Sequence, residues 1–110
     1  IQYYIEVSNM PTTNEAMEYL QEHKLIIVPS KAVNAGGVAV SALEMSQNSM
    51  RLSWSAEDVD ETRKGIMVNI FKQCSQAAEK YCDYRRNYVA GANIAGFLKV
   101  ADAMLAQGVI

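Results

Sequence analysis

The sequence predicts an α/β fold that is mainly helical, in which one strand–helix–strand (βαβ) unit is followed by three long helices. Two short apolar runs, at residues 1–7 and 25–28, flank a segment with helical spacing. Beyond residue 34, apolar side chains recur at the period of about 3.6 residues that is typical of helices. With 110 residues, half of them hydrophobic, and a net charge of -2, the composition is that of one globular unit.

The first strand is expected over residues 1–7, where the sequence reads IQYYIEV. Because the chain starts with Ile1 instead of Met and enters a strand at once, we expect it to be a piece of a longer protein. Thr12 is followed three residues later by Glu15, a spacing that indicates a capping box at the start of a helix. We therefore predict a helix over residues 13–23, and its expected buried stripe is Ala16, Met17 and Leu20.

The second strand is the apolar run LIIV at residues 25–28, which Pro29 ends. A strand, a helix and a strand in this short space predict a parallel pair with a right-handed crossover. An apolar parallel strand must be covered on both faces, and two strands are too few for a stable sheet. The rest of the sheet is therefore expected outside this chain, or from another copy of it.

Three helices are expected next, over residues 35–52, from residue 56, and over residues 88–107. Ser55 followed by Asp58 predicts a capped start for the second, and Gly108 a stop for the third. Apolar side chains of the second helix form a stripe wide enough to be buried against more than one neighbour. The inward residues are expected to be Val59, Ile66, Met67, Ile70, Phe71, Ala77, Ala78 and Tyr81, and then Phe97, Val100, Ala101, Met104 and Leu105.

Charge and composition argue against several classes of partner. Lys and Arg total 10 against 12 Asp and Glu, and the longest basic run is Arg85-Arg86, so neither nucleic acid nor an anionic membrane is expected. No apolar run approaches the roughly 20 residues of a membrane span, and a cytoplasmic location is expected. Cys74 and Cys82, eight residues apart in one predicted helix, would lie about 12 Å apart and are expected to stay reduced.

A ligand site is expected where the two strands end. In open parallel sheets, ligands bind beyond the carboxyl ends of the strands, so the segments after Val7 and Val28 should project from one edge. This places Asn9 near Asn34. Their amides can donate and accept hydrogen bonds, which suits hydroxyls or a carboxamide. In the alternative interpretation, both asparagines only cap turns.

Gly36 and Gly37 stand side by side where the first long helix begins, although glycine is unfavourable in helices by about 0.5–1 kcal/mol. Without Cβ atoms they would let a ligand approach the backbone, where a helix N-terminus favours anions. Alternatively, one of the two glycines only eases a sharp turn after Pro29. Gly91 and Gly96, in GANIAG, match no phosphate-binding spacing and are expected to allow close helix packing. No set of metal ligands is apparent.

Four stretches together resemble the C-terminal portion of bacterial hexameric glutamate dehydrogenases, in the glutamate, leucine, phenylalanine and valine dehydrogenase family: NMPTTNEA, PSKAVNAGGVAVSALEMSQNS, RLSW and GANIAGFLKVADAMLAQG. The resemblance covers nearly the whole chain. It implies that residues 1–86 end a Rossmann-like dinucleotide-binding domain and that residues 87–110 return to the substrate domain. It also implies that Asn9 approaches the nicotinamide ribose, that Asn34 lies between cofactor and substrate, and that Val38 and Ser41 line the substrate pocket.

The reaction implied is the reversible oxidative deamination of L-glutamate to 2-oxoglutarate and ammonia, with NAD or NADP, in a homohexamer. VSNMPTT departs from the commoner GANMPTT of the family but keeps Asn9. The catalytic lysine and aspartate of the family and its glycine-rich loop have no counterpart in this sequence. The fragment alone is therefore expected to be inactive, and the sequence offers no catalytic residue.

Two alternatives stay open. Dehydrogenases for leucine, phenylalanine and valine share NAGGV but tend to have an apolar residue where this chain has Ser41. A hydroxyl there can donate to the distal carboxylate of glutamate, which favours glutamate as substrate. Without the resemblance, the same amphipathic helices could form a non-enzymatic interaction module. That interpretation leaves the coincidence of Asn9, Asn34 and the glycine pair at one edge unexplained.

Overall fold

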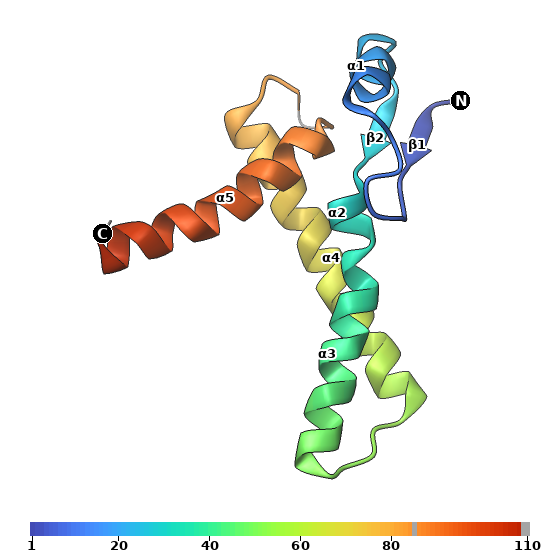
Figure 1. The fold of residues 1–110 in the computed structure, drawn as a ribbon, viewed down its shortest axis with the longest axis vertical. Helices are drawn as coiled ribbons and strands as arrows, with labels where there is room; N and C mark the ends of the chain where they lie inside the picture. The colour runs from blue at the N-terminus through green and yellow to red at the C-terminus, as the bar shows by residue number, and fades with distance from the viewer. Residues whose placement is uncertain (85, 109–110) are drawn as a thin grey trace.

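The computed structural model describes residues 1–84 and 86–108, and its element order confirms the predicted class (Figure 1). A βαβ unit comes first, and long helices make up most of the rest of the chain. Arg85, one half of the predicted basic pair, lies outside the described residues. The elements are β1 (Tyr3–Ile5), α1 (Asn14–Glu22), β2 (Ile26–Val28), α2 (Ser30–Val33), α3 (Ala35–Met50), α4 (Ala56–Tyr81) and α5 (Tyr88–Gln107).

The two strands are parallel, as predicted, and are three residues each, which is shorter than expected. Tyr4 pairs with Ile27, the buried centre of β2, and the ladder continues to the amide of Glu6, which donates to the carbonyl of Val28. Within residues 1–84 and 86–108 the sheet has only these two strands. Tyr3 and Ile5 of β1 point to the same face and are 54% and 58% exposed, so this face of β1 lacks the cover that a buried parallel sheet requires.

The cap of α1 is one residue later than predicted. Thr13 accepts a hydrogen bond from the amide of Ala16 at 3.3 Å, so it is the N-cap. The hydroxyl of Thr12 instead lies 2.9 Å from the hydroxyl of Tyr4 and ties the loop to β1. Adjacent threonines offer the same capping chemistry, and this tertiary contact decides between them. In the predicted buried stripe, Met17 and Leu20 are half-buried, but Ala16 is exposed.

Helix α2 was not predicted as an element. Pro29 stands at its N-cap in an extended conformation, and the single turn Ser30–Val33 leads through Asn34 into α3. Four residues are too few to show a helical period in a sequence. The amide of Asn34 donates to the carbonyl of Ser30 at 2.8 Å, so Asn34 is both the C-cap of α2 and the N-cap of α3.

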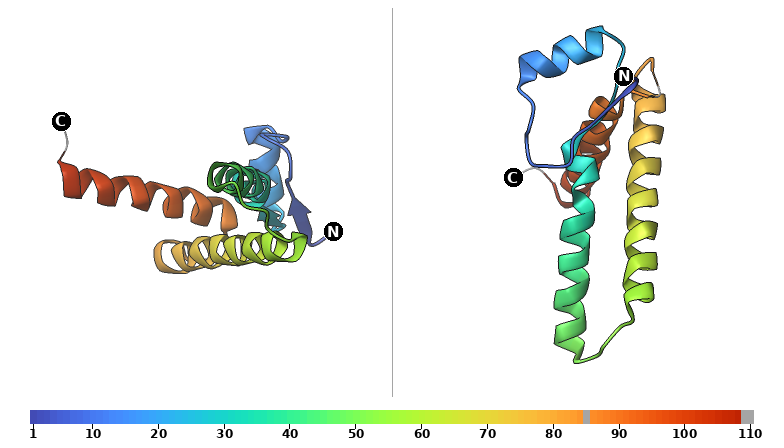
Figure 2. Two further views of the ribbon diagram at one scale, coloured as in Figure 1. Left: turned by 90° about the horizontal axis from the view of Figure 1, so that it is seen from below. Right: turned by 90° about the vertical axis from the view of Figure 1, so that its right-hand side faces the viewer.

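Helices α3 and α4 form a long antiparallel hairpin (Figures 1 and 2). Helix α3 ends at Met50 instead of Leu52, because Arg51 takes a left-handed conformation with φ of 55°. Ser55 and Asp58 form the predicted capping box at the start of α4. Helix α4 contacts α2, α3 and α5, which confirms that its wide apolar stripe serves more than one neighbour, although the predicted inward residues Phe71 and Tyr81 are exposed.

Helices α4 and α5 pack closely against each other. Gly91 of α5 is buried there, and a Cβ on it would lie 2.2 Å from the carbonyl oxygen of Cys74 and 3.1 Å from the Cβ of Ala78. This confirms close packing at Gly91. The prediction of close helix packing is wrong for Gly96, because a Cβ on Gly96 would meet nothing within 4 Å. Gly108 ends α5 with φ of 83°, as predicted.

The molecule is open, with a radius of gyration of 16.6 Å where a compact chain of this size has about 13 Å. The prediction that the second half of α5 faces inward is wrong for most of its apolar residues. Phe97 is 66% exposed and Leu105 is 82% exposed, because α5 extends beyond α4 (Figure 1). Helix α5 is also long and apolar enough, with mean hydropathy of 1.4, to cross a membrane by length and composition, contrary to expectation. Length and composition alone do not identify a membrane span, and little of α5 is buried in the part of the chain that the structure describes.

Candidate functional site

The candidate site lies at the edge where both strands end, as the βαβ topology predicts. Because β1 and β2 are parallel and in register, Val7 and Pro29 leave the sheet at the same edge. The loop after β1 and the short helix α2 after β2 then run beside each other (Figure 1).

Asn9 and Asn34 come together at this edge. The Nδ2 atom of Asn34 donates to the Oδ1 atom of Asn9 at 2.5 Å. Asn34 occupies the N-cap position of α3, but its side chain makes no capping hydrogen bond there and bonds to Asn9 instead. The Nδ2 atom of Asn9 and the Oδ1 atom of Asn34 remain as one donor and one acceptor for a ligand.

A buried carboxylate supports this pair and was missed in the sequence. Glu6 is 6% exposed, and its Oε2 atom accepts a hydrogen bond from the amide of Ser30 at 3.3 Å. Charged side chains are rarely buried without a partner. In the sequence, Glu6 only continues the alternation of a strand, and its partner is 24 residues away. Only the side-by-side placement of the two strands identifies it.

Both glycines lie inside regular helix, so the alternative that one of them eases a turn is wrong. Both residues belong to α3, and neither has a positive φ. The two differ in their surroundings. A Cβ on Gly36 would lie 3.1 Å from the sulfur of Met67 in α4, whereas a Cβ on Gly37 would meet nothing within 4 Å. Gly36 therefore allows α3 to approach α4, and only Gly37 leaves open space at the ligand edge.

Val38 and Ser41 lie one turn apart on the exposed side of α3. Val38 is 72% exposed, so its side chain is open to a ligand, although it is one of many exposed apolar side chains in this chain. The hydroxyl of Ser41 donates to the carbonyl of Gly37 at 3.2 Å. This bond holds the hydroxyl beside the open face of Gly37, and a stronger acceptor such as a carboxylate could replace the carbonyl.

A cleft of about 600 Å³ lies between the end of β1, the start of α3 and α4. It brings Asn34, Gly36 and Gly37 to one wall, whereas Val38 and Ser41 are not among its described lining residues. Arg63 of α4 is a cation on the opposite wall that sequence reasoning missed, and it is ion-paired with Asp60 on its own helix. The other lining residues are the apolar Val7, Val33, Val40 and Met67.

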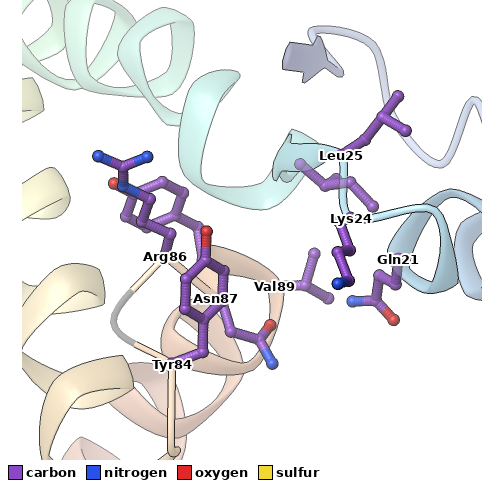
Figure 3. Close-up of a pocket in the computed structure, with 9 residues that line it drawn as sticks. Gln21, Lys24, Leu25, Tyr84, Arg86, Asn87 and Val89 are labelled. Carbon is purple, nitrogen blue, oxygen red and sulfur yellow. The ribbon is translucent and has the colours of Figure 1, made fainter. Parts of the chain in front are cut away.

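A second hollow, of about 470 Å³, lies where the turn before β2 meets the start of α5 (Figure 3). Lys24 and Gln21 point toward one another on one side, and Tyr84 and Asn87 belong to the other side (Figure 3). This position corresponds to the amino end of β2, away from Asn9 and Asn34. No predicted site residue lines this hollow in the described part of the chain.

Among residues 1–84 and 86–108, two side chains have shifted pKa values, and both lie outside the Asn9 and Asn34 region. The pKa of Glu15 is lowered mainly by a backbone hydrogen bond at the start of α1, and to a smaller extent by a hydrogen bond with the side chain of Thr13. Burial raises the pKa of the Cys74 thiol. Cys74 and Cys82 are both free thiols, as predicted. In residues 1–84 and 86–108, no three His, Cys, Asp or Glu side chains form a group that could hold a metal ion.

Comparison with known proteins places this geometry in a family. A family model of glutamate/leucine/phenylalanine/valine dehydrogenases matches residues 1–108. The chain is 58% identical to the NAD-specific glutamate dehydrogenase of Clostridium symbiosum over 99% of its own length and 24% of that protein. It is 52% identical to the NADP-specific glutamate dehydrogenase of Giardia intestinalis, over 100% of its own length and 24% of that protein.

Solved structures agree. One glutamate dehydrogenase superposes with a TM-score of 0.90 at 57% identity, over 99% of this chain and 24% of that one. Glutamate dehydrogenase from Plasmodium falciparum gives a TM-score of 0.86 at 51% identity, over 94% of this chain and 22% of that one. The chain thus spans about a quarter of the length of these relatives. The parallel strand pair of this chain brings Asn9 and Asn34 together at its carboxyl edge. By the match over residues 1–108, the chain belongs to the glutamate/leucine/phenylalanine/valine dehydrogenase family.

Proposed function

We propose that the protein containing this chain is a glutamate dehydrogenase. It would catalyse the reversible NAD- or NADP-dependent oxidative deamination of L-glutamate to 2-oxoglutarate and ammonia. The observation that carries this proposal is the identity of 52–58% along essentially the whole chain to proteins named NAD-specific or NADP-specific glutamate dehydrogenase. The direct test is glutamate-dependent reduction of NAD⁺ and of NADP⁺ by the purified full-length protein. Absence of both reactions would overturn the proposal.

In this proposal, the edge of the strand pair supplies contacts to the cofactor and to the substrate. Asn9 would approach the nicotinamide ribose, and Asn34 would lie where cofactor and substrate meet. The contact between their amides supports this assignment, because the pair keeps one donor and one acceptor for such groups. Gly36 and Gly37 would admit the cofactor to the start of α3, and the open space beside Gly37 supports this for Gly37.

Val38 and Ser41 would select glutamate over the apolar substrates of the wider family. Burying the distal carboxylate of glutamate without a partner costs several kcal/mol, and the Ser41 hydroxyl can donate to it. The hydroxyl is already a donor, toward the Gly37 carbonyl at 3.2 Å. A site built to bond a polar group rejects analogues that lack that group more strongly than an apolar pocket rejects a change in size.

Ser41→Val in the full-length enzyme tests this selection. We expect kcat/KM for glutamate to fall by about 10-fold or more, since a hydrogen bond to a charged group is worth about 1.5–3 kcal/mol, and the preference to shift toward apolar amino acids. Ser46→Val is a matched control, because the Ser46 hydroxyl makes the same kind of bond, to the carbonyl of Ala42 at 2.9 Å. Unchanged glutamate kinetics in Ser41→Val would remove Ser41 from the pocket.

The chain alone should be inactive. The catalytic lysine and aspartate expected for the family and its glycine-rich loop have no counterpart among these 110 residues. Measurable glutamate oxidation by a purified chain of these residues would contradict this prediction.

We also propose that residues 1–86 complete a dinucleotide-binding domain and that residues 87–110 cross to a substrate domain. The exposed apolar side chains of α5, such as Phe97 and Leu105, support a further protein surface beside this helix. A homohexameric assembly, a cytoplasmic location and the lack of nucleic-acid or membrane partners belong to the same proposal. Light scattering of the full-length protein, and fractionation of cells that produce it, would test the assembly and the location.

A non-enzymatic interaction module is the competing interpretation, and the same exposed face of α5 favours it. The two interpretations differ in what Asn9 and Asn34 do. Titration of NAD⁺ and NADP⁺ into the full-length protein decides between them. Saturable binding that Asn34→Ala weakens supports the dehydrogenase, and no binding of either nucleotide supports the module.

A further inference from the structure

The two asparagines of the candidate site belong to separate segments, and each segment is short and exposed. Asn9 lies in the loop after β1, and Asn34 follows the single turn of α2. A hydrogen bond between exposed amides is worth only about 1 kcal/mol, so it cannot by itself hold two segments in register. Another interaction must set their separation.

A buried hydrogen bond lies beside this pair. In both bonds, the donor belongs to the segment after β2 and the acceptor to the segment at the end of β1. The amide of Ser30 donates to Glu6, and the side chain of Asn34 donates to Asn9, so two links join the segment after β1 to the segment after β2. Glu6 precedes Asn9 by three residues, and Ser30 precedes Asn34 by four. Between the links there is no long loop, because Ser30–Val33 is helical. Displacing Ser30 therefore displaces Asn34.

The carboxylate of Glu6 takes the place of an N-cap for α2. Pro29, at the N-cap position, makes no side-chain capping hydrogen bond. The first amides of a helix need acceptors, and a carboxylate near a helix N-terminus is favoured by charge as well. Glu6 is 6% exposed, and its own amide is held by Val28 in the sheet, so its position is determined by the strand pair.

Helix α2 has a further anchor on its other side. The Nζ atom of Lys31 donates to the Oδ1 atom of Asn93 in α5 at 2.5 Å. Lys31 and Asn93 are both exposed, whereas Glu6 and Ser30 are buried. Because water competes at the exposed contact, the buried one is the stronger constraint on where α2 begins.

We propose that Glu6 is a positioning residue of the candidate site. Its buried carboxylate holds the amide of Ser30, and through α2 it keeps Asn34 within hydrogen-bond distance of Asn9. Glu6 itself would touch neither cofactor nor substrate. The kinetic part of the inference rests on the proposed function, and the structural part does not.

Three variants of the full-length protein separate this role from a general loss of stability. Glu6→Ala removes the acceptor, and Glu6→Gln keeps an acceptor oxygen of the same reach. Ser30→Pro removes the donor and leaves Glu6 in place; proline is well accepted at the first helical position, and Pro29 already has the extended conformation required before proline. Ser55→Ala, which removes the cap of α4 at the far end of the hairpin, is the matched control for lost stability.

Because a displacement of about 1 Å at a site can cost up to 100-fold, we expect kcat/KM for glutamate to fall by about 10- to 100-fold in Glu6→Ala and Ser30→Pro. We expect Glu6→Gln to stay within about threefold of the wild type, and Ser55→Ala to leave kcat/KM unchanged. Glu6→Ala and Asn34→Ala should be non-additive, because they would act on the same contact. Additive effects, or a kcat/KM in Glu6→Ala equal to that of the control, would overturn the proposal.

Crystal structures of Glu6→Ala and Ser30→Pro provide a readout that needs no activity. We expect the Nδ2 atom of Asn34 to lie beyond hydrogen-bond distance of the Oδ1 atom of Asn9 in both, and within it in Glu6→Gln. An unchanged contact in both disrupting variants would overturn the positioning role. If the wild type fails to oxidise glutamate with either nucleotide, the proposed function fails, and these structures still decide the role of Glu6.

Discussion

Helix α4 packs against the two other long helices, α3 and α5, and these two contacts are built differently. Toward α5, Gly91 brings helix backbones together, with a Cβ position only 2.2 Å from the carbonyl oxygen of Cys74. Toward α3, a Cβ on Gly36 would lie 3.1 Å from the sulfur of Met67, which is a flexible side chain. A glycine against backbone is a steric requirement, whereas a glycine against methionine can be replaced at little cost. The contact with α5 is thus the rigid one, and the contact near the candidate site is adjustable.

Gly91→Ala should have the largest effect on stability. The new methyl group cannot fit unless α4 and α5 separate, because the atom that it meets belongs to the backbone of Cys74. We expect a loss of about 3 kcal/mol in the free energy of unfolding, measured by urea denaturation followed by circular dichroism. A loss below about 1 kcal/mol would show that this contact is as adjustable as the one between α3 and α4.

Gly96→Ala is the control within the same helix. A Cβ at Gly96 meets nothing within 4 Å, so only helix propensity changes. The variant should gain about 0.5–1 kcal/mol. If both variants lose stability equally, the effect belongs to α5 as a whole and not to the contact with Cys74.

Cysteine reactivity should report the same rigid contact. Cys74 is buried under α5, and burial raises the pKa of its thiol, so less of the reactive thiolate is present at neutral pH. Cys82 is half-buried beyond the end of α4. We expect iodoacetamide to modify Cys82 faster than Cys74, as followed by peptide mass spectrometry, because Cys74 is both less accessible and poorer in thiolate. Equal rates would mean that the contact between α4 and α5 opens readily.

The adjustable contact should respond weakly to substitution. In Gly36→Ala the gain in helix propensity opposes a shift of the Met67 side chain, and we expect a change within about 0.5 kcal/mol. Gly37→Ala should gain about 0.5–1 kcal/mol, because its Cβ would point into open space. Thermal denaturation of both variants measures these changes.

The same two variants sharpen the assignment of the site. If a ligand approaches the backbone at Gly37, Gly37→Ala should weaken nucleotide binding to the full-length protein while it raises stability. Opposite signs in the two measurements identify a functional glycine. Equal affinity in wild type and Gly37→Ala would exclude contact at this position.

Elements whose signals are local could be predicted closely from the sequence. Helix α5 was expected over residues 88–107 and is observed over Tyr88–Gln107, and the capping box of Ser55 and Asp58 is present. Where neighbouring residues offer the same chemistry, the sequence was insufficient. Thr12 and Thr13 can both cap a helix, and the hydrogen bond between Thr12 and Tyr4 leaves the capping role to Thr13.

The site was predictable in part, for a similar reason. The rule that ligands bind beyond the carboxyl ends of parallel strands is enough to predict that Asn9 and Asn34 lie together. Glu6 and Arg63 were not predicted, because an acidic residue at a strand end and a basic residue in a helix have the pattern of ordinary surface positions. The burial of Glu6, and the position of Arg63 across the cleft from Asn34, depend on elements far away in the sequence.

The sequence by itself determined the order of the elements apart from α2, the caps at Ser55 and Gly108, and the edge at which the candidate site lies, because these depend on short-range spacing and on the topology of a βαβ unit. Only the tertiary structure decided which of two alike residues is used. Gly91 is packed and Gly96 is not, and Gly36 faces α4 whereas Gly37 faces open space. The physical reason is that the direction of a side chain in a helix follows from local geometry, but what it meets depends on where the neighbouring helices lie.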